Sequence, residues 1–381
     1  TAGTPTNAEV GSHSVVLEVT DGTAITTQSF GVVVANTNDA PIFGSVPVTA
    51  ATEDAAYSYS ISTSDVDGDP LTITATTLPA WLTLTDNGDG TASLTGTPTN
   101  AEVGSHSVVL EVTDGTAITT QSFSIAVANT NDTPTFGSDP VTAATEDSAY
   151  SYAIATSDVD GDPLTITATT LPAWLTITDN GDGTASLTGT PTNSEVGSHS
   201  VVLEVTDGTA ITTQSFSVVV ANTNDAPTFG SAPVTVATED SAYSYAIAAS
   251  DVDGDPLTIT ATTLPTWLTL TDNGDGTASL TGTPTNSEVG SHSVVLEVTD
   301  GTTITTQSFS VVVANTNDAP TFGSVPVTAA TEDSAYSYAI ATSDVDGDPL
   351  TITATTLPTW LTLTDNGDGT ASLTGTPTNA Q

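Results

Sequence analysis

The sequence predicts an all-β protein made of tandem β-sandwich repeats, and three observations carry this prediction. Thr, Val, Ser, Gly and Pro are abundant, and β-branched residues interspersed with turn formers are typical of β-structure. Apolar residues alternate with small or polar ones at a period of two in many short segments. Self-similarity is the strongest signal, because the DVDGD motif begins at Asp65, Asp158, Asp251 and Asp344, each 93 residues after the one before.

The 93-residue period indicates the domain organisation. A unit of this length fits a small β-sandwich with its own core, and it exceeds the ~20–50 residues of a solenoid repeat. We therefore expect an extended rod of units that each fold around a separate core. The predicted domains are residues 1–38 (a partial repeat with C-terminal strands), 39–131, 132–224 and 225–317 (complete repeats), and 318–381 (a partial repeat with N-terminal strands).

The two partial repeats overlap in sequence, since the tail GTPTNAQ matches the head GTPTNAE. We interpret the chain as a window cut from a longer array. An alternative stays open, in which the ends complement each other between molecules by strand donation. A few strands alone leave sheet edges and an apolar face exposed, so something must cover them.

Residues 132–224 show the elements expected within one repeat. Alternation with small residues predicts strands around Tyr150–Ile154, Leu164–Ile166, Val201–Val205 and Phe216–Val220, and roughly seven such segments fit in a repeat. Residues 178–185, TDNGDGTA, are expected to form a hairpin turn, because Asn-Gly and Asp-Gly supply residues that tolerate positive φ. The Trp that follows LPA or LPT in each repeat is expected to pack in the core.

The charge balance excludes some classes of partner. The chain has 45 acidic residues and neither Lys nor Arg, for a formal charge of -45. Nucleic acid and anionic membranes need a basic surface, so neither is an expected electrostatic partner, whereas inorganic cations are. The absence of Cys excludes disulfides and thiolate metal sites. No apolar run approaches the ~18 residues of a membrane helix, so we expect no membrane insertion.

The acidic residues recur in a fixed order in every repeat. In residues 132–224 this order is Asp132 in ANTNDTP, Glu146 in ATEDSAY, Asp158 and Asp160 in SDVDGD, Glu195 in TNSEVG, and Asp207 in EVTDG. It resembles the cadherin repeat, which has an early Glu, a D-x-D pair, a mid-domain acidic motif and an acidic residue in the next-to-last strand, and whose linker is followed by Pro and an aromatic. The segment LPAWLTITDNGDGTASLTGTPTNSEVGSHSVVLEVTDG resembles the cadherin-like, immunoglobulin-like modules of large bacterial surface adhesins.

The resemblance implies a Greek-key β-sandwich and a shared Ca²⁺ site at each joint, built by one repeat, its linker and the following repeat. Joint one would gather Glu9, Asn36, Asn38, Asp39, Asp65, Asp67 and Asp114. Joint two would gather Glu53, Glu102, Asn129, Asn131, Asp132, Asp158, Asp160 and Asp207. Joint three would gather Glu146, Glu195, Asn222, Asn224, Asp225, Asp251, Asp253 and Asp300. Joint four would gather Glu239, Glu288, Asn315, Asn317, Asp318, Asp344 and Asp346.

Elementary electrostatics supports a cation at these joints independently of the resemblance. Two carboxylates ~5 Å apart repel each other by roughly 3 kcal/mol at an effective dielectric constant of ~20. Oxygen-only ligands select Ca²⁺ or Mg²⁺ over softer metals, and many flexible carboxylates favour Ca²⁺. An EF-hand is excluded, because it needs Gly at loop position six and Glu at twelve, where counting from Asp158 gives Pro163 and Thr169.

Several acidic and aromatic residues have a simpler interpretation beside the functional one. Asp162 is either a third ligand or a turn residue before Pro163, and these two alternatives stay open. Asp179 and Asp182 are interpreted as turn formers, and Glu204 as solvent-facing. The one His per repeat lacks a second His or Cys nearby in sequence and is interpreted as a surface polar residue.

The sequence therefore favours a structural extender of a secreted bacterial adhesin or fibre, on the cell surface, with Ca²⁺ at its joints and no enzymatic activity. No strained Gly-x-Ser-x-Gly turn and no phosphate-binding Gly loop is present. The expected partners are neighbouring repeats of the same chain or of identical chains, and a cell-surface or glycan target elsewhere in the full protein. Multivalent modules that bind carbohydrate or protein are one alternative, and a head-to-tail filament subunit is another.

Overall fold

A computed structural model describes residues 3–379. Within them, none of the helices is long and apolar enough to cross a membrane. The chain divides into two compact units. The first contains the chain up to Ala144, Ser148–Thr190 and Gly197–Val220; the second contains Thr145–Asp147, Pro191–Val196 and the chain from Ala221 onward. We call residues 39–131, 132–224 and 225–317 repeats 1, 2 and 3, and residues 1–38 and 318–381 the N-terminal and C-terminal segments.

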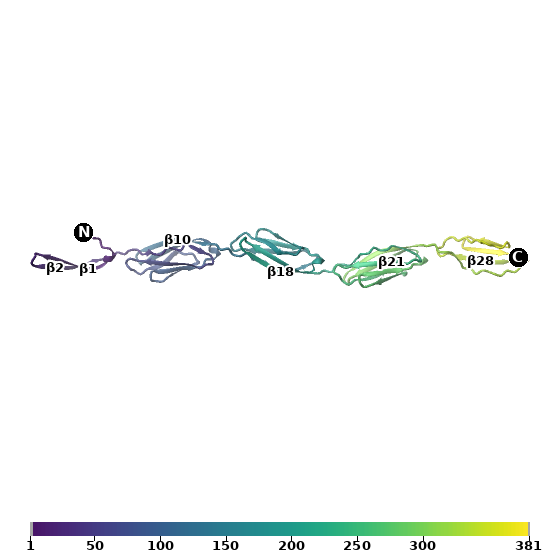
Figure 1. The fold of residues 1–381 in the computed structure, drawn as a ribbon, viewed down its shortest axis with the longest axis horizontal. Coiled ribbons are helices and arrows are strands. Elements are labelled where there is room, and N and C mark those ends of the chain that lie inside the picture. The colour runs from purple at the N-terminus through teal and green to yellow at the C-terminus, as the bar shows by residue number, and fades with distance from the viewer. Residues whose placement is uncertain (1–2, 380–381) are drawn as a thin grey trace. The chain divides into compact units, whose positions relative to one another are not determined.

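Repeat 1 is a sandwich of two four-stranded sheets. Its elements are β3 (Ile42–Phe43), β4 (Ala50–Thr52), β5 (Tyr57–Ser64), β6 (Thr72–Thr77), β7 (Leu82–Asp86), β8 (Thr91–Gly96), the 3₁₀ helix η2 (Asn100–Glu102), β9 (Gly104–Thr113) and β10 (Ile118–Ala128), the last labelled in Figure 1. One sheet has the order β4-β10-β9-β6 and the other β3-β5-β8-β7. The chain changes sheet at every step from β3 to β7 and again between β8 and β9, in agreement with the expected Greek-key sandwich.

The same arrangement recurs in the other complete repeats, which confirms the all-β prediction and the 93-residue period. Repeat 2 consists of β11 (Thr135–Phe136), β12 (Ala143–Thr145), β13 (Tyr150–Ser157), β14 (Thr165–Thr170), β15 (Leu175–Asp179), β16 (Thr184–Gly189), η3 (Asn193–Glu195), β17 (Gly197–Thr206) and β18 (Ile211–Ala221). Repeat 3 consists of β19 (Thr228–Phe229), β20 (Val236–Thr238), β21 (Tyr243–Ser250), β22 (Thr258–Thr263), β23 (Leu268–Asp272), β24 (Thr277–Gly282), η4 (Asn286–Glu288), β25 (Gly290–Thr299) and β26 (Ile304–Ala314).

Strand alternation places the core between the two sheets, as the sequence pattern predicts. In β21, Tyr243, Tyr245 and Ile247 are buried while the residues between them are exposed. Leu296 in β25 is fully buried from the facing sheet. The Trp of each repeat packs against this core, and Trp267 meets Tyr243 edge to face at 5.7 Å between ring centroids. Each complete repeat has a separate cluster of buried side chains, so each has its own core.

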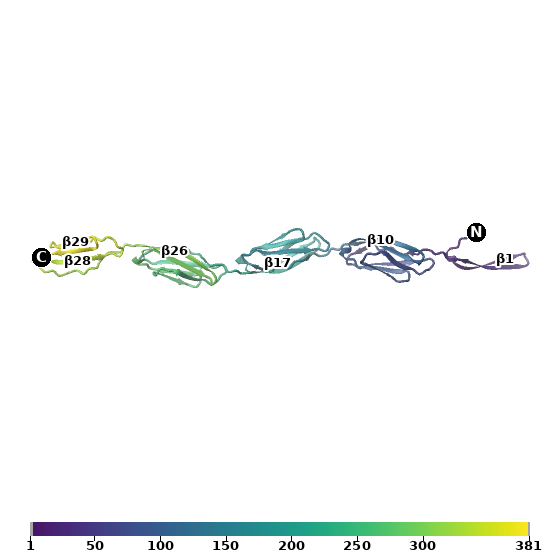
Figure 2. The same cartoon turned by 180° about the vertical axis from the view of Figure 1, so that it is seen from behind.

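The N-terminal and C-terminal segments hold only parts of this sandwich. The N-terminal segment has η1 (Asn7–Glu9) and the hairpin of β1 (Gly11–Thr20) and β2 (Ile25–Val34), drawn in purple in Figure 1. The C-terminal segment has β27 (Thr321–Phe322), β28 (Tyr336–Ser343), β29 (Leu361–Asp365) and β30 (Thr370–Gly375), of which Figure 2 labels β28 and β29. These four strands form one sheet, in the order β27-β28-β30-β29.

One sequence shows how strand formation depends on the partner strand. TITATT forms β6, β14 and β22 in the complete repeats, but residues 351–356 have the same sequence and form no strand. In repeat 1, Thr72 of β6 pairs with Thr113 of β9. Residues 351–356 have no such partner among the described residues, so their backbone groups lack the ladder that stabilises a strand.

Candidate metal centre

Each complete repeat has an almost fully buried Glu, which lies beside the linker that leads to the following repeat. Glu53 directly follows β4, and its side chain is only 2% exposed. The next residue, Asp54, has φ of 55°, a left-handed conformation that Asp tolerates better than most side chains, and its N–H donates to the carbonyl of Pro98. The tight turn fixes the direction of the Glu53 side chain.

The buried carboxylate is only half satisfied. Oε1 of Glu53 accepts a hydrogen bond from the backbone N–H of Thr130, in the linker that leads to repeat 2. Oε2 is buried and has no hydrogen-bond partner. The same holds for Glu146, with Thr223, and for Glu239, with Thr316. A buried carboxylate oxygen without a donor is costly, and binding a cation is one way to offset that cost.

The D-x-D loop of the following repeat supplies the next carboxylates. In repeat 2 the N–H of Asp160 donates to Oδ1 of Asp158 at 2.9 Å, and Gly161 has φ of 77°, which lets the loop turn tightly. Oδ2 of Asp158 is buried and without a hydrogen-bond partner, as are the equivalent atoms of Asp65 and Asp251.

The linker Asp completes the cluster. Asp132 donates its N–H to Oδ2 of Asp160 at 2.7 Å, so the linker is held against the D-x-D loop. One oxygen each from Glu53, Asp132 and Asp160 lie within 4.8 Å of one another. Loss of water raises the pKa of Asp132, and the nearby Asp160 charge raises it further. The corresponding groups are Glu146, Asp225 and Asp253, and Glu239, Asp318 and Asp346.

The Asp of the TDG sequence, which is Asp207 in repeat 2, also binds the linker. Asn131 donates from Nδ2 to the carbonyl of Asp132 at 2.8 Å and to Oδ2 of Asp207 at 2.9 Å. Oδ1 of Asp207 accepts from the N–H groups of Ala210 and Thr209, and the bonds from Ala210, Asn131 and Thr209 lower the pKa of Asp207. Asn38 contacts Asp114, and Asn224 contacts Asp300, in the same way, while Asn317 bonds the carbonyl of Asp318.

A second acidic group lies within the D-x-D loop itself. Oxygens of Asp158, Asp160 and Asp162 lie within 4.8 Å of one another, and Asp65, Asp67 and Asp69 form the same group in repeat 1. The structure therefore brings Asp162 beside the D-x-D pair. The Asp179 side chain has a structural role instead, because its Oδ2 accepts from the N–H of Ile166 at the start of β14.

The mid-domain Glu predicted as a ligand caps a 3₁₀ helix. Oε2 of Glu102 accepts from both the N–H and the hydroxyl of Thr99, at 2.9 and 2.7 Å, and these bonds lower the pKa of Glu102. Glu9, Glu195 and Glu288 accept from Thr6, Thr192 and Thr285 in the same way. Oε2 of each carboxylate is therefore engaged within its own turn, and Oε1 of Glu195 and of Glu288 also accepts from Ser194 and Ser287.

The residue of this turn that reaches the acidic cluster is an Asn that the sequence analysis did not select. Asn100 donates from Nδ2 to Oδ1 of Asp160 at 2.5 Å. The first Asn of each linker is peripheral: Asn36 and Asn129 are exposed, and Asn222 and Asn315 accept from Asn193 and Asn286 at 3.5 and 3.4 Å. The T-x-x-E spacing of Thr99 and Glu102 is the sequence signal for the cap.

Comparison with protein families decides the family of these repeats. Residues 40–128, 133–221, 226–314 and 319–381 each match the family model described as Putative Ig domain. The chain belongs to this family. A comparison with curated proteins found no match.

Solved structures to which this chain is similar include a glycoside hydrolase, a protocadherin and a titin fragment. An endo-fucoidan hydrolase, MfFcnA4 from glycoside hydrolase family 107, is 31% identical over 70% of this chain and 43% of its own, with a TM-score of 0.28. The chain thus spans less than half of that hydrolase. Extracellular cadherin domains 1–4 of protocadherin Gamma B7 are 14% identical over 80% of this chain and 84% of theirs, with a TM-score of 0.40. An I-band fragment of titin is 12% identical over 72% of this chain and 99% of its own, with a TM-score of 0.34.

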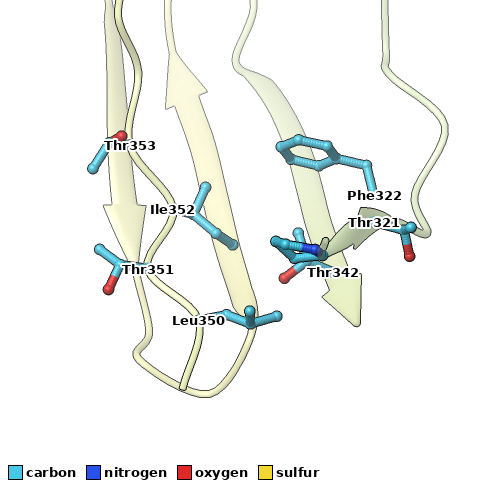
Figure 3. A pocket seen from close by; sticks show the side chains of 8 residues that line it. Thr321, Phe322, Thr342, Leu350, Thr351, Ile352 and Thr353 are labelled. Carbon is cyan, nitrogen blue, oxygen red and sulfur yellow. The ribbon is translucent and has the colours of Figure 1, made fainter. Parts of the chain in front are cut away.

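A groove in the C-terminal segment is a consequence of missing strands. Figure 3 shows Phe322 and Ile352 facing each other across it, with Leu350 at one end. Phe322 is 72% exposed, whereas in the third Ig domain the equivalent Phe229 packs against the core beside Phe309 of β26. In a complete Ig domain a second four-stranded sheet packs on this face, and the described residues of the C-terminal segment form no such sheet.

The His residues have a packing role in the Ig domains. The ring of His106 meets Trp81 edge to face at 6.1 Å, and its Nε2 lies 2.6 Å from the carbonyl oxygen of Glu102. His106 is half-buried, so one part of its ring packs on the domain while another part stays at the surface. No acidic cluster described above contains a His residue.

Proposed function

We propose that these tandem Ig domains are the extender of an extracellular surface protein and that Ca²⁺ bound at the joints between domains stiffens the array. The proposed role is mechanical, without catalysis: the array holds another part of the protein away from the cell, or forms a fibre. Tandem β-sandwiches with separate cores support the extender role, because such domains contribute length independently.

The single observation that supports cation binding is the buried Glu oxygen that has no hydrogen-bond partner. Glu239 is 1% exposed, its Oε2 has no hydrogen-bond donor, and Asp318 and Asp346 each place an oxygen within 4.8 Å of one of its oxygens. Three converging carboxylates repel one another, and a divalent cation converts this repulsion into attraction. The buried position also limits competition from water.

The chemistry of the donors favours Ca²⁺. All three side chains offer carboxylate oxygens, and the chain has no Cys that would favour a softer metal. Carboxylates from three separate segments form an irregular, adaptable set, which suits the flexible coordination of Ca²⁺ better than the strict octahedron of Mg²⁺. Extracellular calcium modules bind with Kd values of ~10⁻⁴–10⁻³ M, and ligand at ~100 times Kd adds about 2.7 kcal/mol per site.

An extracellular, bacterial location is part of the proposal. Ig-like repeats are typical of extracellular proteins. A chain without Lys and Arg offers no trypsin site, which suits an exposed stalk. The partners we propose are neighbouring domains of the same or identical chains, with any glycan or cell-surface target bound elsewhere in the full protein.

The test compares the full chain with two triple variants of equal charge. One carries Glu53→Gln, Glu146→Gln and Glu239→Gln at the joints; the control carries Glu111→Gln, Glu204→Gln and Glu297→Gln on the outer strand faces. Titration calorimetry with CaCl₂, and small-angle scattering in Ca²⁺ and then in EGTA, should show binding and a larger maximum dimension with Ca²⁺ for the wild type and the control. The joint variant should lose most of both effects. No binding heat and an unchanged dimension in the wild type would end the proposal.

A further inference from the structure

An amide side chain bridges each joint next to the carboxylate cluster. Asn100 opens η2, which the Thr99–Glu102 cap holds in place, and its Nδ2 lies 2.5 Å from Oδ1 of Asp160, 60 residues further along the chain. The contact recurs at every joint. The equivalent distances are 2.9 Å for Asn7 to Asp67, 2.5 Å for Asn193 to Asp253 and 2.6 Å for Asn286 to Asp346.

The surroundings fix which way the amide points. The atom that faces Nδ2 of Asn100 is a carboxylate oxygen, which can only accept hydrogen bonds. At joint one, Nδ2 of Asn7 faces two such oxygens, from Asp39 at 2.7 Å and from Asp67. An amide oxygen in this place would meet only acceptors, so the NH₂ group must face the Asp. The bond is charge-assisted and therefore stronger than one between neutral groups.

The amide uses a carboxylate that the cation would also use. Both oxygens of Asp160 already accept hydrogen bonds, Oδ1 from Asn100 and Oδ2 from the N–H of Asp132. The same Asp160 contributes an oxygen to the cluster with Glu53 and Asp132. A cation bound to this cluster would lie close to the positive end of the Asn100 amide dipole, and the two would repel each other.

We propose that Asn100 and its equivalents Asn7, Asn193 and Asn286 form a cation-independent latch that links adjacent domains through the D-x-D Asp and competes with the divalent cation for it. The competition half of this inference rests on the proposed function, whereas the latch stands on the hydrogen bonds alone. The joint then alternates between an amide-latched form and a cation-bound form. The latch lowers the cation affinity, so that the joint switches at the high Ca²⁺ concentrations of the extracellular space.

The test removes all four latch amides in the full chain, with Asn7→Ala, Asn100→Ala, Asn193→Ala and Asn286→Ala. A matched control removes four hairpin amides, with Asn87→Ala, Asn180→Ala, Asn273→Ala and Asn366→Ala; each of these donates only to a Thr in its own turn. Two dyes are attached through Ser58→Cys in the first Ig domain and Ser151→Cys in the second, which are the sole thiols because the chain has no Cys. Energy transfer between them reports the spread of interdomain distances.

Two results are expected from the latch variant. In EGTA its distance distribution should be broader than that of the wild type and of the hairpin control, because the bond from Asn100 to Asp160 is lost and only the linker still contacts the D-x-D loop. In a calcium titration its affinity should rise roughly tenfold, since the cation no longer displaces a hydrogen bond to a charged group.

Each half of the proposal has its own contrary result. An unchanged distribution in EGTA would overturn the latch. A weaker calcium affinity in the variant would show that the amide oxygen is a ligand, and would overturn the competition. A wild type that binds no Ca²⁺ at all would overturn the proposed function together with the competition, whereas the measurement in EGTA would still decide the latch.

Discussion

The carboxylate of Glu239 accepts a hydrogen bond at 2.5 Å from the backbone N–H of Thr316, 77 residues further along the chain. Glu239 directly follows β20, and Thr316 lies in the linker after β26, so this bond ties the linker to the end of its own domain. In the C-terminal segment the equivalent Glu332 is exposed, and no linker residue contacts it among residues 3–379. The Glu is therefore buried only where both the linker and the sheet that contains β20 and β26 are present.

We expect the effect of Glu239→Gln to change sign with Ca²⁺. The Gln oxygen keeps the bond from Thr316, and its NH₂ group replaces the unpartnered oxygen beside Asp318 and Asp346. In EGTA the variant should be stabilised by about 1 kcal/mol, because one repulsive charge is lost. In millimolar Ca²⁺ it should be less stable than the wild type, because one ligand is lost. Calorimetry in both buffers measures this, and a shift of the same sign in both would contradict it.

Gly282→Ala should unfold or severely destabilise the third Ig domain. A Cβ at Gly282 would lie 2.1 Å from the carbonyl oxygen of Trp267 and 3.0 Å from its ring, so backbone must move. We expect a loss of roughly 3 kcal/mol or more for this domain. Gly230→Ala in the same domain is the control, because its Cβ would meet its nearest atom at 3.8 Å. Urea unfolding followed by Trp fluorescence should show one weakened transition for Gly282→Ala and none for Gly230→Ala; equal midpoints would refute the steric argument.

Tyr245→Phe should cost about 1–3 kcal/mol in the third Ig domain, because it leaves buried polar partners unsatisfied. The Tyr245 hydroxyl lies 2.9 Å from Oε1 of Gln307 and 3.1 Å from the carbonyl oxygen of Ser231, and the ring is 2% exposed. Tyr336→Phe in the C-terminal segment is the comparison, since its hydroxyl bonds one carbonyl at an exposed position. Denaturant unfolding of both variants measures the difference. A neutral Tyr245→Phe would mean that water replaces the hydroxyl without cost.

Alkaline pH should destabilise all three complete Ig domains. Burial raises the pKa of Tyr57, Tyr150 and Tyr243 from 10.0 to about 12, with a smaller contribution from a neighbouring Tyr. Because the folded pKa lies above the unfolded one, the associated stability is fully present below pH 10 and is lost as the pH rises towards 12. Urea midpoints between pH 8 and pH 12 should fall in that window. In Tyr243→Phe the urea midpoint of the third domain should fall less steeply with pH. An unaltered slope would argue against Tyr243 as a source of the pH dependence.

Much of the sandwich could be predicted from the sequence because its strands carry their burial pattern locally. Tyr243, Tyr245 and Ile247 alternate with small residues, which is enough to assign a half-buried strand. The parallel pairing of Val236 in β20 with Val312 in β26 could not be predicted, because a three-residue strand shows no period and its partner is far away in sequence. Residues 351–356 show the same limit, since a strand pattern without a partner forms no strand.

The order of acidic residues predicted which carboxylates to consider, but not how each is used. Oxygens of Glu53, Asp132 and Asp160 lie within 4.8 Å of one another, and their role as metal ligands stays a prediction. Glu102 belongs to the same predicted set, yet a capping bond within its own turn engages one of its oxygens, and Asn100 from that turn contacts Asp160 instead. Their charge made the acidic residues recognisable in the sequence, whereas the neutral amide of Asn100 gave no such signal. Only the geometry of η2 shows that Glu102 caps the turn and that Asn100 contacts Asp160.

The dependence of TITATT on its partner strand has a consequence for how such an array folds during synthesis on the ribosome. Because Thr72 of β6 pairs with Thr113 of β9, the first strands of each domain can complete their sheet only after the later β-hairpin has been synthesised. The corresponding hairpins of neighbouring domains are nearly identical in sequence. A mispaired, strand-exchanged neighbour would therefore be almost as stable as the correct fold. Vectorial delivery from the N-terminus resolves this degeneracy kinetically, since each waiting half-sandwich meets its own hairpin before that of the next domain exists.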